Sequence, residues 1–287
     1  MKKFFKLMIA ISVLSSAFSA CTKESEQDGL YNPKKKISEI VYQNKGVQYG
    51  QTYYTITKEI WTWNGNQLTS IDFGSGDGAY HYRTTMFRYD NKSRIEEMEI
   101  VGFRTYIFDY KDDVINVINC YDQIGDFIGK YEFKHKDNKI SEIIIQGPDD
   151  NAKDALFNPL RFFLPDNTAE MVMNSTSKGT THYKFSWSGN NVSKIEISDA
   201  ANATATYKYK YDNKSNPFKS LYNLMDIAYA AICSANNATQ IVYHMDDKDI
   251  TVNYTYVYED NYPVEKSRTY TQNLANITET TKYIYKD

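Results

Sequence analysis

Residues 185–197, FSWSGNNVSKIEI, decide the fold predicted for this chain. Before the turn at 188–191 aromatic residues alternate with polar ones, and after it isoleucines alternate with charged ones. A period of two is that of a strand with one apolar and one solvated face. Gly189 and its asparagine neighbours suit the positive φ angles of a tight turn, so the stretch predicts a β-hairpin. Val192 departs from the alternation, which predicts a bulge or a slightly longer loop.

The same hairpin pattern recurs along most of the chain. Pairs of aromatic residues, or an aromatic residue and a histidine, precede a polar turn at eight places, beginning at Trp61, Phe87, Phe108, Phe133, Phe185, Tyr209, Tyr256 and Tyr283. Most steps between them are 21 to 27 residues, and the steps of 52 and 47 residues are about twice as long. A fixed period is typical of a repeat architecture, and the long steps predict an altered copy or an insertion.

The predicted fold is therefore all-β with one inserted helix. We expect an antiparallel hairpin meander of about fourteen to eighteen short strands. Closure into a soluble barrel, or strong curling, would hide its long apolar face. A membrane-spanning barrel is the alternative, because the recurring aromatic residues resemble an interfacial girdle. The strands look about five to seven residues long, shorter than the roughly nine to eleven of a spanning strand, which favours the soluble barrel.

Two segments interrupt the repeat. Residues 148–180 carry three prolines among leucines and phenylalanines, which predicts a short helix and loop over an apolar surface. After Pro217, apolar residues at helical spacing predict a helix over about residues 220–235, capped by Ser220. The apolar stripe of this helix needs a partner, so we expect it to cover or plug the barrel interior.

The N-terminus predicts export and lipid attachment. Residues 1–20 have the basic start, apolar run and small closing residues of a signal peptide. Cys21 follows directly, as in a bacterial lipobox with Phe18 at the usual leucine position. Lipidation of Cys21 would anchor the chain to a membrane; an ordinary secretory signal with an incidental cysteine is the alternative. The acidic residues 21–33 predict a flexible tether to a single domain at 34–287.

Charge and motifs argue against several functions. The net charge is −3, and removal of the three signal-peptide lysines lowers it to −6, which argues against nucleic-acid binding. The sequence contains no nucleophile elbow, zincin motif or dinucleotide fingerprint, so we predict no cofactor, no metal site and no catalytic residue. A hydrolase with an acid pair hidden among the many carboxylates is the alternative. The 26 tyrosines are first explained by strand packing.

Smaller clusters leave alternatives open. Residues 244–249, HMDDKD, read as a hairpin turn or as a weak cation site. The glycine-rich residues 74–78 read as a plain loop or as a phosphate or cation cradle. Cys120 and Cys233 remain single thiols or, in an oxidising envelope, form a disulfide if the helix packs near Cys120.

The run at 209–218, YKYDNKSNPF, followed by the predicted helix, carries a family resemblance. With residues 87–90 and 185–197, it resembles Bacteroidetes envelope lipoproteins that contain a porin-like domain of unknown function. Their repeats are similar to the tyrosine-aspartate repeats of large secreted shell proteins. The resemblance covers most of residues 34–287 and implies no activity, so no catalytic residue can be transferred.

These features together predict a lipid-anchored outer-membrane protein that faces the periplasm or, preferably, the cell surface. The favoured function is a non-catalytic module that binds a glycan, a lipid or a small molecule. Candidate ligand-binding residues are Trp187, Phe162 and Phe163. The alternative is a structural or interaction subunit of an outer-membrane complex, whose partner is an envelope protein.

Overall fold

The computed structural model describes residues 29–147, 180–198, 204–222, 229–245, 248–272 and 275–286. Across these residues the chain forms 17 strands and one short helix, α3 (Tyr229–Cys233). The first nine strands are β1 (Ile37–Gln48), β2 (Gln51–Asn64), β3 (Gln67–Ser75), β4 (His81–Tyr89), β5 (Ile95–Ile100), β6 (Arg104–Lys111), β7 (Val114–Asp122), β8 (Phe127–Lys136) and β9 (Lys139–Gln146). The remaining eight are β10 (Thr181–Ser188), β11 (Asn191–Ser198), β12 (Thr204–Ser215), β13 (Asn236–Met245), β14 (Lys248–Asn253), β15 (Thr255–Glu259), β16 (Tyr262–Gln272) and β17 (Ala275–Tyr285). The predicted all-β class is confirmed.

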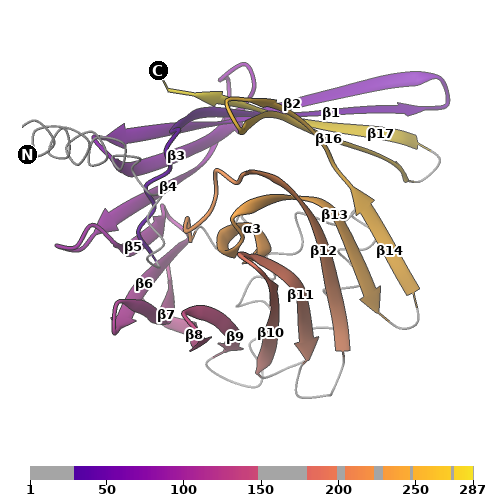
Figure 1. The fold of residues 1–287 in the computed structure, drawn as a ribbon. Helices are drawn as coiled ribbons and strands as arrows, with labels where there is room; N and C mark the ends of the chain where they lie inside the picture. Colours follow the sequence, from indigo (N-terminus) through magenta and orange to yellow (C-terminus); the bar gives the residue numbers. More distant parts are fainter. Residues whose placement is uncertain are drawn as a thin grey trace, which may run out of the picture.

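The strands form one antiparallel meander that nearly closes into a barrel (Figure 1). Each strand pairs with the next from β1 to β14 and again from β15 to β17. The last strand, β17, pairs with the first, β1, and closes the circle. Only Tyr254 separates β14 from β15, and the two strands pair with different neighbours. Among the described strands no ladder joins β14 to residues 268–272 of β16, so the wall is open there.

A β-bulge recurs in the repeated hairpins. In β10–β11, Trp187 pairs with Val192 while Ser186 pairs with Lys194, so Ser193 is an extra residue. The bulge predicted beside this turn is confirmed. The same register shift occurs opposite the second residue of the pair in other copies, namely Trp63, Tyr89, Tyr110, His135, Tyr211 and Tyr258. Because each bulge increases the local twist and bends its strand, the repeated bulges curl the meander toward closure.

The second aromatic residue of the pair also ties neighbouring hairpins together. In five copies its N–H or O–H donates to the carbonyl oxygen of a residue near the start of the adjacent strand. Tyr89 Oη lies 2.7 Å from Leu68 O, and Tyr110 Oη lies 2.6 Å from Ile95 O. Equivalent bonds join Trp63 Nε1 to Ile37 O, Trp187 Nε1 to Ile140 O, and Tyr285 Oη to Pro263 O. This position therefore favours Tyr or Trp, which supply an apolar ring and a donor together.

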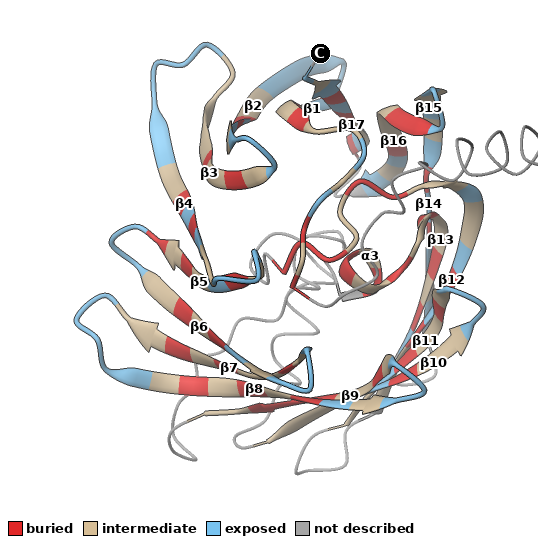
Figure 2. Ribbon diagram, turned by 60° about the vertical axis from the view of Figure 1, so that its left-hand side comes forward, coloured by how far each residue is buried: buried red, intermediate tan, exposed pale blue. Residues whose placement is uncertain are grey.

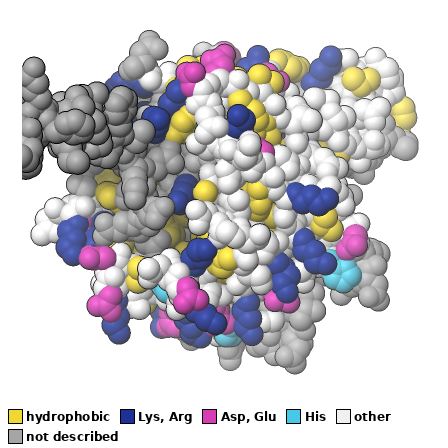
Figure 3. All heavy atoms as spheres, viewed as in Figure 1, with side chains coloured by type: hydrophobic (Ala, Val, Ile, Leu, Met, Phe, Trp, Pro, Cys, Tyr) yellow, Lys and Arg dark blue, Asp and Glu magenta, His cyan; other side chains and the backbone are white. Residues whose placement is uncertain are grey.

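The core lies on the inner faces of the strands, and the outer faces are mostly polar, with a few exposed apolar residues such as Met86 and Val257. Along β8, Tyr131 and Phe133 are buried, and they alternate with the charged residues Lys130, Glu132 and Lys134. Figure 2 shows the same bands of buried and less buried residues on the other strands. On the outside, Lys134 Nζ lies 2.6 Å from Glu142 Oε2, and Figure 3 shows cationic and acidic side chains interspersed over one face. An apolar inside and a charged outside are the reverse of a lipid-facing barrel.

The strands are longer than the sequence suggested. β2 has 14 residues, and β1 and β12 have 12 each. The predicted length of about five to seven residues counted only the alternating apolar segments, and the strands continue into polar residues beyond them. Strand length therefore does not argue against a membrane-spanning barrel. The remaining argument against one is the polarity of the outer face.

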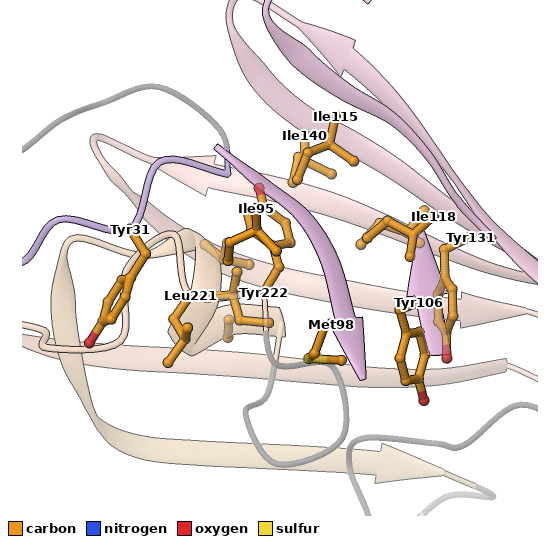
Figure 4. Close-up of a cluster of buried hydrophobic side chains, with 14 of the residues drawn as sticks. Tyr31, Ile95, Met98, Tyr106, Ile115, Ile118, Tyr131, Ile140, Leu221 and Tyr222 are labelled. Atoms are coloured by element: carbon orange, nitrogen blue, oxygen red, sulfur yellow. The ribbon is translucent and has the colours of Figure 1, made fainter. Parts of the chain in front are cut away.

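Residues between β12 and β13 fill the barrel interior. This segment, which we call the plug, comprises the described residues 216–222 and 229–235 (Figures 1 and 2). Leu221 and Tyr222 are buried near Ile95 of the barrel wall (Figure 4). Asn216 holds the plug together, because its Nδ2 donates to Ala231 O at 2.5 Å and Ser234 O at 2.8 Å. The plug thus occupies the long step after Tyr209, for which the sequence left an altered copy or an insertion open.

The start of the predicted helix is wrong. Ser220 has a φ of 66° and lies in a turn in which Leu221 N donates to Phe218 O. A helix cap has a negative, extended φ, so Ser220 does not serve as one. The described helical turn is Tyr229–Cys233, and residues 223–228 lie outside the described part. No helix in the described ranges is long and apolar enough to cross a membrane.

The packed domain begins earlier than residue 34. Gly29 O accepts a hydrogen bond from Ile95 N, and Tyr31 is 2% exposed. The Tyr31 hydroxyl donates to Pro217 O at 2.9 Å, which ties the N-terminal segment to the plug. The predicted signal peptide, Cys21 and most of the predicted insertion at 148–180 lie outside the described residues.

Candidate functional site

A cavity of about 440 Å³ lies inside the barrel. We call it the lumen cavity. One side is formed by the inner faces of β1, β2, β16 and β17, which contribute Tyr42, Glu59, Arg268 and Glu279. The plug forms another side and contributes Phe218. This volume falls within the roughly 300–1,000 Å³ typical of small-molecule sites.

Aromatic side chains dominate the wall of the lumen cavity. They are Tyr42, Trp61, Phe73, Tyr209, Tyr211, Phe218, Tyr254, Tyr256, Tyr270 and Tyr283. Phe218 of the plug packs between two of them, with ring centroids 6.3 Å from Trp61 and 5.9 Å from Tyr283. Burial holds the pKa of Tyr283 well above its ordinary value, so this phenol stays neutral at physiological pH. The wall can therefore pack against the rings or chains of a ligand.

An arginine and a carboxylate form a buried pair beside these rings. Arg268 is 9% exposed, and its Nε donates to Glu279 Oε2. The other oxygen, Oε1, accepts a bond of 2.7 Å from Tyr270 Oη. Burial is the largest single influence and lowers the pKa of Arg268, but the hydrogen bond to Glu279, its charge and the neighbouring Tyr254 and Tyr270 together outweigh burial and raise that pKa. The charges of this pair therefore neutralise each other.

The second carboxylate is also held by donors of the barrel wall. Glu59 is 5% exposed, and its two oxygens accept bonds of 3.0 Å from Tyr42 Oη and 2.9 Å from Trp61 Nε1. Because both oxygens are occupied, Glu59 fixes the positions of two aromatic residues of the cavity wall.

Lys266 differs from the other charged residues of the lumen cavity. Its Nζ lies 5.2 Å from the ring centroid of Tyr254. Within the described part of the chain, no carboxylate oxygen lies within ion-pair distance of this nitrogen and no acceptor bonds it. Burial, together with repulsion by Arg268, lowers the pKa of Lys266 to about 8. The described lining holds three cations and two carboxylates, which leaves one positive charge.

Lys266 also departs from the internal repeat. It is the cross-strand partner of Tyr256, the first aromatic residue of its hairpin. The equivalent partners in the other seven copies are apolar, namely Ile71, Met98, Ile118, Ile143, Ile195, Ile241 and Ile40. Sequence reasoning missed Lys266, because residues 265–271 are almost all polar. Without an alternation of apolar and polar residues, the sequence does not indicate which side chains point inward. Aligning the copies with their bulges would have shown a lysine at an apolar position.

The predicted ligand residues lie elsewhere or outside the described part. Trp187 does not line the lumen cavity among the described residues; its Nε1 donates to Ile140 O at 2.8 Å, and Lys139 Nζ lies 5.3 Å from its ring centroid. The indole thus has the same wall contact as Trp63. Phe162 and Phe163 lie outside the described residues. A ligand role for these three side chains stays a prediction.

The smaller clusters show local contacts. Asp77 Oδ1 accepts hydrogen bonds from Ser75 Oγ at 2.5 Å and from Ala79 N at 2.9 Å. The Asp77 carboxylate thus forms hydrogen bonds within the glycine-rich loop. His244 Nδ1 lies 2.8 Å from Asp249 Oδ1 on the surface, and residues 246–247 are outside the described part. Where the structure describes the chain, no three His, Cys, Asp or Glu side chains cluster in a way that would hold a metal ion.

The two internal cysteines do not form a disulfide with each other in the described structure. Cys120 is buried on β7 and faces Gly129 across the ladder with β8. Burial raises the pKa of the Cys120 thiol to about 11, so the thiol is protonated and unreactive at neutral pH.

The fold and cavity define a class of protein: a nearly closed antiparallel barrel with a polar exterior, an internal plug and a cavity in its lumen. No protein-family model matches the sequence, and no curated protein is detectably similar to it. A crystal structure of a porin-like protein from Bacteroides uniformis is similar, with a TM-score of 0.51 and 14% identity over 87% of this chain and 98% of that chain. A porin-like protein from Bacteroides vulgatus matches with 10% identity over 88% and 99% of the two chains, at a TM-score of only 0.27. At these identities the likeness to the B. uniformis protein shows a shared barrel fold.

Proposed function

We propose that this chain is a lipid-anchored protein of the bacterial cell envelope that binds a small ligand in the lumen cavity without catalysis. The observation that carries the proposal is a cavity of about 440 Å³ in the barrel lumen, with ten aromatic residues in its wall. Such a wall suits the ring faces of a glycan, the hydrocarbon of a lipid or another amphipathic small molecule.

The envelope location rests on the signal peptide and on Cys21 at its end. The fold that this chain shares with a porin-like Bacteroides protein supports the same compartment. Gly29, the first described residue, accepts a hydrogen bond from Ile95 N at the start of β5. Cys21 lies eight residues earlier, a length that spans at most about 28 Å. The lipid would therefore hold the start of β5 near the outer membrane, with the protein on its periplasmic or, preferably, surface side.

A role without catalysis is supported by the hydrogen-bond donors that hold the two cavity carboxylates. Glu59 is held by Tyr42 and Trp61, and Glu279 by Arg268 and Tyr270. A glycosidase-type acid pair needs one carboxyl group that can protonate a leaving group and one that can act as a base or nucleophile. Carboxylates engaged by these donors serve instead to fix the wall.

The proposal can be tested with a substitution whose bulky side chain fills the lumen cavity. Thr57 lines it from β2, and Thr62 on the same strand is exposed. The wild type and both variants are screened by thermal shift against a panel of glycans, lipids and bile acids. We expect one class of compound to stabilise the wild type and the Thr62→Trp control, and not to stabilise Thr57→Trp. A ligand at 100 times its dissociation constant stabilises by about 2.7 kcal/mol. Equal stabilisation of both variants would place binding outside the cavity and contradict the proposal.

A second function, as an interaction subunit of an envelope complex, is favoured by exposed apolar residues at the turns between β1–β2, β3–β4 and β7–β8. We call these turns the apolar rim; they carry Tyr49, Tyr80 and Ile124, which are 83%, 68% and 76% exposed. Exposed apolar patches mark interaction sites in soluble proteins. If this function is correct, replacing the three residues by serine should abolish co-purification of one envelope protein, while Thr57→Trp should leave it unchanged.

A further inference from the structure

We infer that the ligand of the lumen cavity is an organic monoanion, with a carboxylate, sulfate or sulfonate group on an apolar, ring-containing body, and that Lys266 contacts its charged group. This inference rests on the proposed function, because it names the chemical class of the molecule that occupies the cavity. It depends on three observations: an unpaired cation, its place in the repeat and the character of the wall around it.

The unpaired cation comes first. Arg268 and Lys266 face the same cavity from one strand, two residues apart. Arg268 is ion-paired with Glu279, while Lys266 lies beside the ring of Tyr254 and has no carboxylate within ion-pair distance in the described structure. A partly desolvated ammonium without a counter-charge destabilises a fold unless something else binds it. A bound anion would supply the missing partner and form a charge-assisted hydrogen bond.

Packing of the barrel core does not explain why a lysine occupies position 266 of the repeat. The same position is apolar in the other seven copies, and isoleucine fills it in six of them. An isoleucine at 266 would complete the apolar layer, as it does in β7, where Ile118 is fully buried. Lys266 therefore departs from the pattern of apolar residues at this repeat position. Departures of this kind occur at functional sites.

The surroundings define the rest of the ligand. The net single positive charge of the described lining matches one negative charge. Away from Lys266, the wall is formed by rings such as Trp61 and Phe218, whose centroids are 6.3 Å apart. These rings favour an apolar body with its own ring system, because aromatic faces gain by offset or edge contact. A highly charged ligand, such as a nucleoside triphosphate, would leave several negative charges without partners.

A matched pair of fluorescent dyes tests the inference on the purified full chain. The probes are 8-anilino-1-naphthalenesulfonate and N-phenyl-1-naphthylamine, which share their rings and differ in the sulfonate group. At pH 7 we expect the wild type to bind the sulfonate dye about tenfold or more tightly than the neutral dye, as a charge-assisted hydrogen bond allows. Lys266→Met should lose this preference and still bind the neutral dye, whereas Lys266→Arg should retain it.

The control lysine is Lys208, which is exposed on β12. Lys208→Met should keep the wild-type preference, and Thr57→Trp should lose both dyes. If the wild type binds both dyes equally, or if Lys266→Met keeps the preference, the inference is wrong and the proposed function stands. If neither dye binds the wild type, both the inference and the proposed cavity function are wrong.

The pH profile of the preference is a second readout. The ionisable groups that line the cavity with Lys266 are Arg83, Arg268, Glu59, Glu279 and the tyrosines Tyr42, Tyr209, Tyr211, Tyr254, Tyr256, Tyr270 and Tyr283. Burial lowers the pKa of Lys266 to about 8, so its ammonium group loses its proton as the pH rises from 7 to 9. The preference for the sulfonate dye should therefore fall as the pH rises from 7 to 9 in the wild type and stay flat in Lys266→Arg. A flat wild-type profile would contradict the assigned contact.

Discussion

The ammonium nitrogen of Lys266 lies 5.2 Å from the ring centroid of Tyr254, at the residue that separates β14 from β15. The charged side chain thus faces the lumen at the point where the barrel wall changes its pairing. Cation–π attraction to a tyrosine contributes about 0.5–2 kcal/mol, less than the cost of desolvating an ammonium group. The contact explains how Lys266 is tolerated in the lumen and leaves its charge available.

The first prediction concerns the pH dependence of stability. The pKa of Lys266 is about 8 in the folded chain and near the ordinary 10.5 in the unfolded chain. Between these values the unfolded chain binds more protons, so the cost of the partly desolvated ammonium is present below pH 8 and is relieved as the pH rises. From pH 7 to 10 the free energy of unfolding of the wild type should rise by about 1–3 kcal/mol relative to that of Lys266→Met.

Urea unfolding of both proteins at several pH values measures this difference. Lys208→Met is the control, because its side chain is exposed and its removal should leave the pH profile of the wild type unchanged. A constant gap between the wild type and Lys266→Met over this range would show that the ammonium is not desolvated.

The second prediction concerns the hydrogen bonds that tie neighbouring hairpins. Tyr110→Phe keeps the ring but removes the hydroxyl that donates to Ile95 O at 2.6 Å. The carbonyl loses its partner at the barrel wall, so the free energy of unfolding should fall by about 1 kcal/mol. Tyr49→Phe removes an equal hydroxyl from a side chain that is 83% exposed and should change stability by less than about 0.5 kcal/mol. Equal effects in denaturant titrations would remove the structural role assigned to this hydroxyl.

The third prediction concerns the plug. Asn216→Ala removes two donated bonds, to Ala231 O and Ser234 O, and one bond accepted from Phe218 N. We expect a loss of about 2 kcal/mol, because buried backbone carbonyls are left without donors. Asn66→Ala, which removes an exposed contact with Lys36, is the matched control and should be nearly neutral. A plug that docks independently of Asn216 would give equal melting temperatures for the two variants.

The fourth prediction concerns Cys120. Because burial raises the pKa of its thiol to about 11, the thiolate is on the order of one part in a thousand at pH 8. In a variant with Cys21→Ser and Cys233→Ser, a thiol reagent should label the folded chain no faster than it unfolds. The same variant in urea should be labelled at the rate of a free peptide thiol. Rapid labelling of the folded variant would mean that solvent reaches this part of the core.

Much of the fold could be read from residues 185–197 and their copies. The alternation, the polar turns and the departure at Val192 predicted the hairpin and its bulge, because these are local consequences of backbone geometry. The helix start could not be read in the same way. Ser220 satisfies the sequence preference of a cap, but packing of Leu221 and Tyr222 inside the barrel imposes a turn there. Contacts distant in sequence overrode the local preference.

The candidate site was less accessible to sequence reasoning. Trp187 was selected as an aromatic residue of the best-defined hairpin, yet its indole N–H bonds Ile140 and the ring stays outside the lining of the described cavity. Lys266 lies in a polar segment that gives no indication of which side chains point inward. A strand slipped by one residue would turn Lys266 outward, so its position depends on the register with Tyr256.

The sequence by itself determined the hairpins, because the period of two, the turn residues and the bulges act over a few neighbouring residues. It also determined that the hairpins must share one apolar face, since no single hairpin can bury its own. Only the tertiary structure decided that β17 pairs with β1, that the plug lies inside the ring and that Lys266 faces Tyr254 across a cavity. These features depend on closure, which brings together strands more than 200 residues apart and thereby turns a polar stretch of β16 into one wall of a cavity.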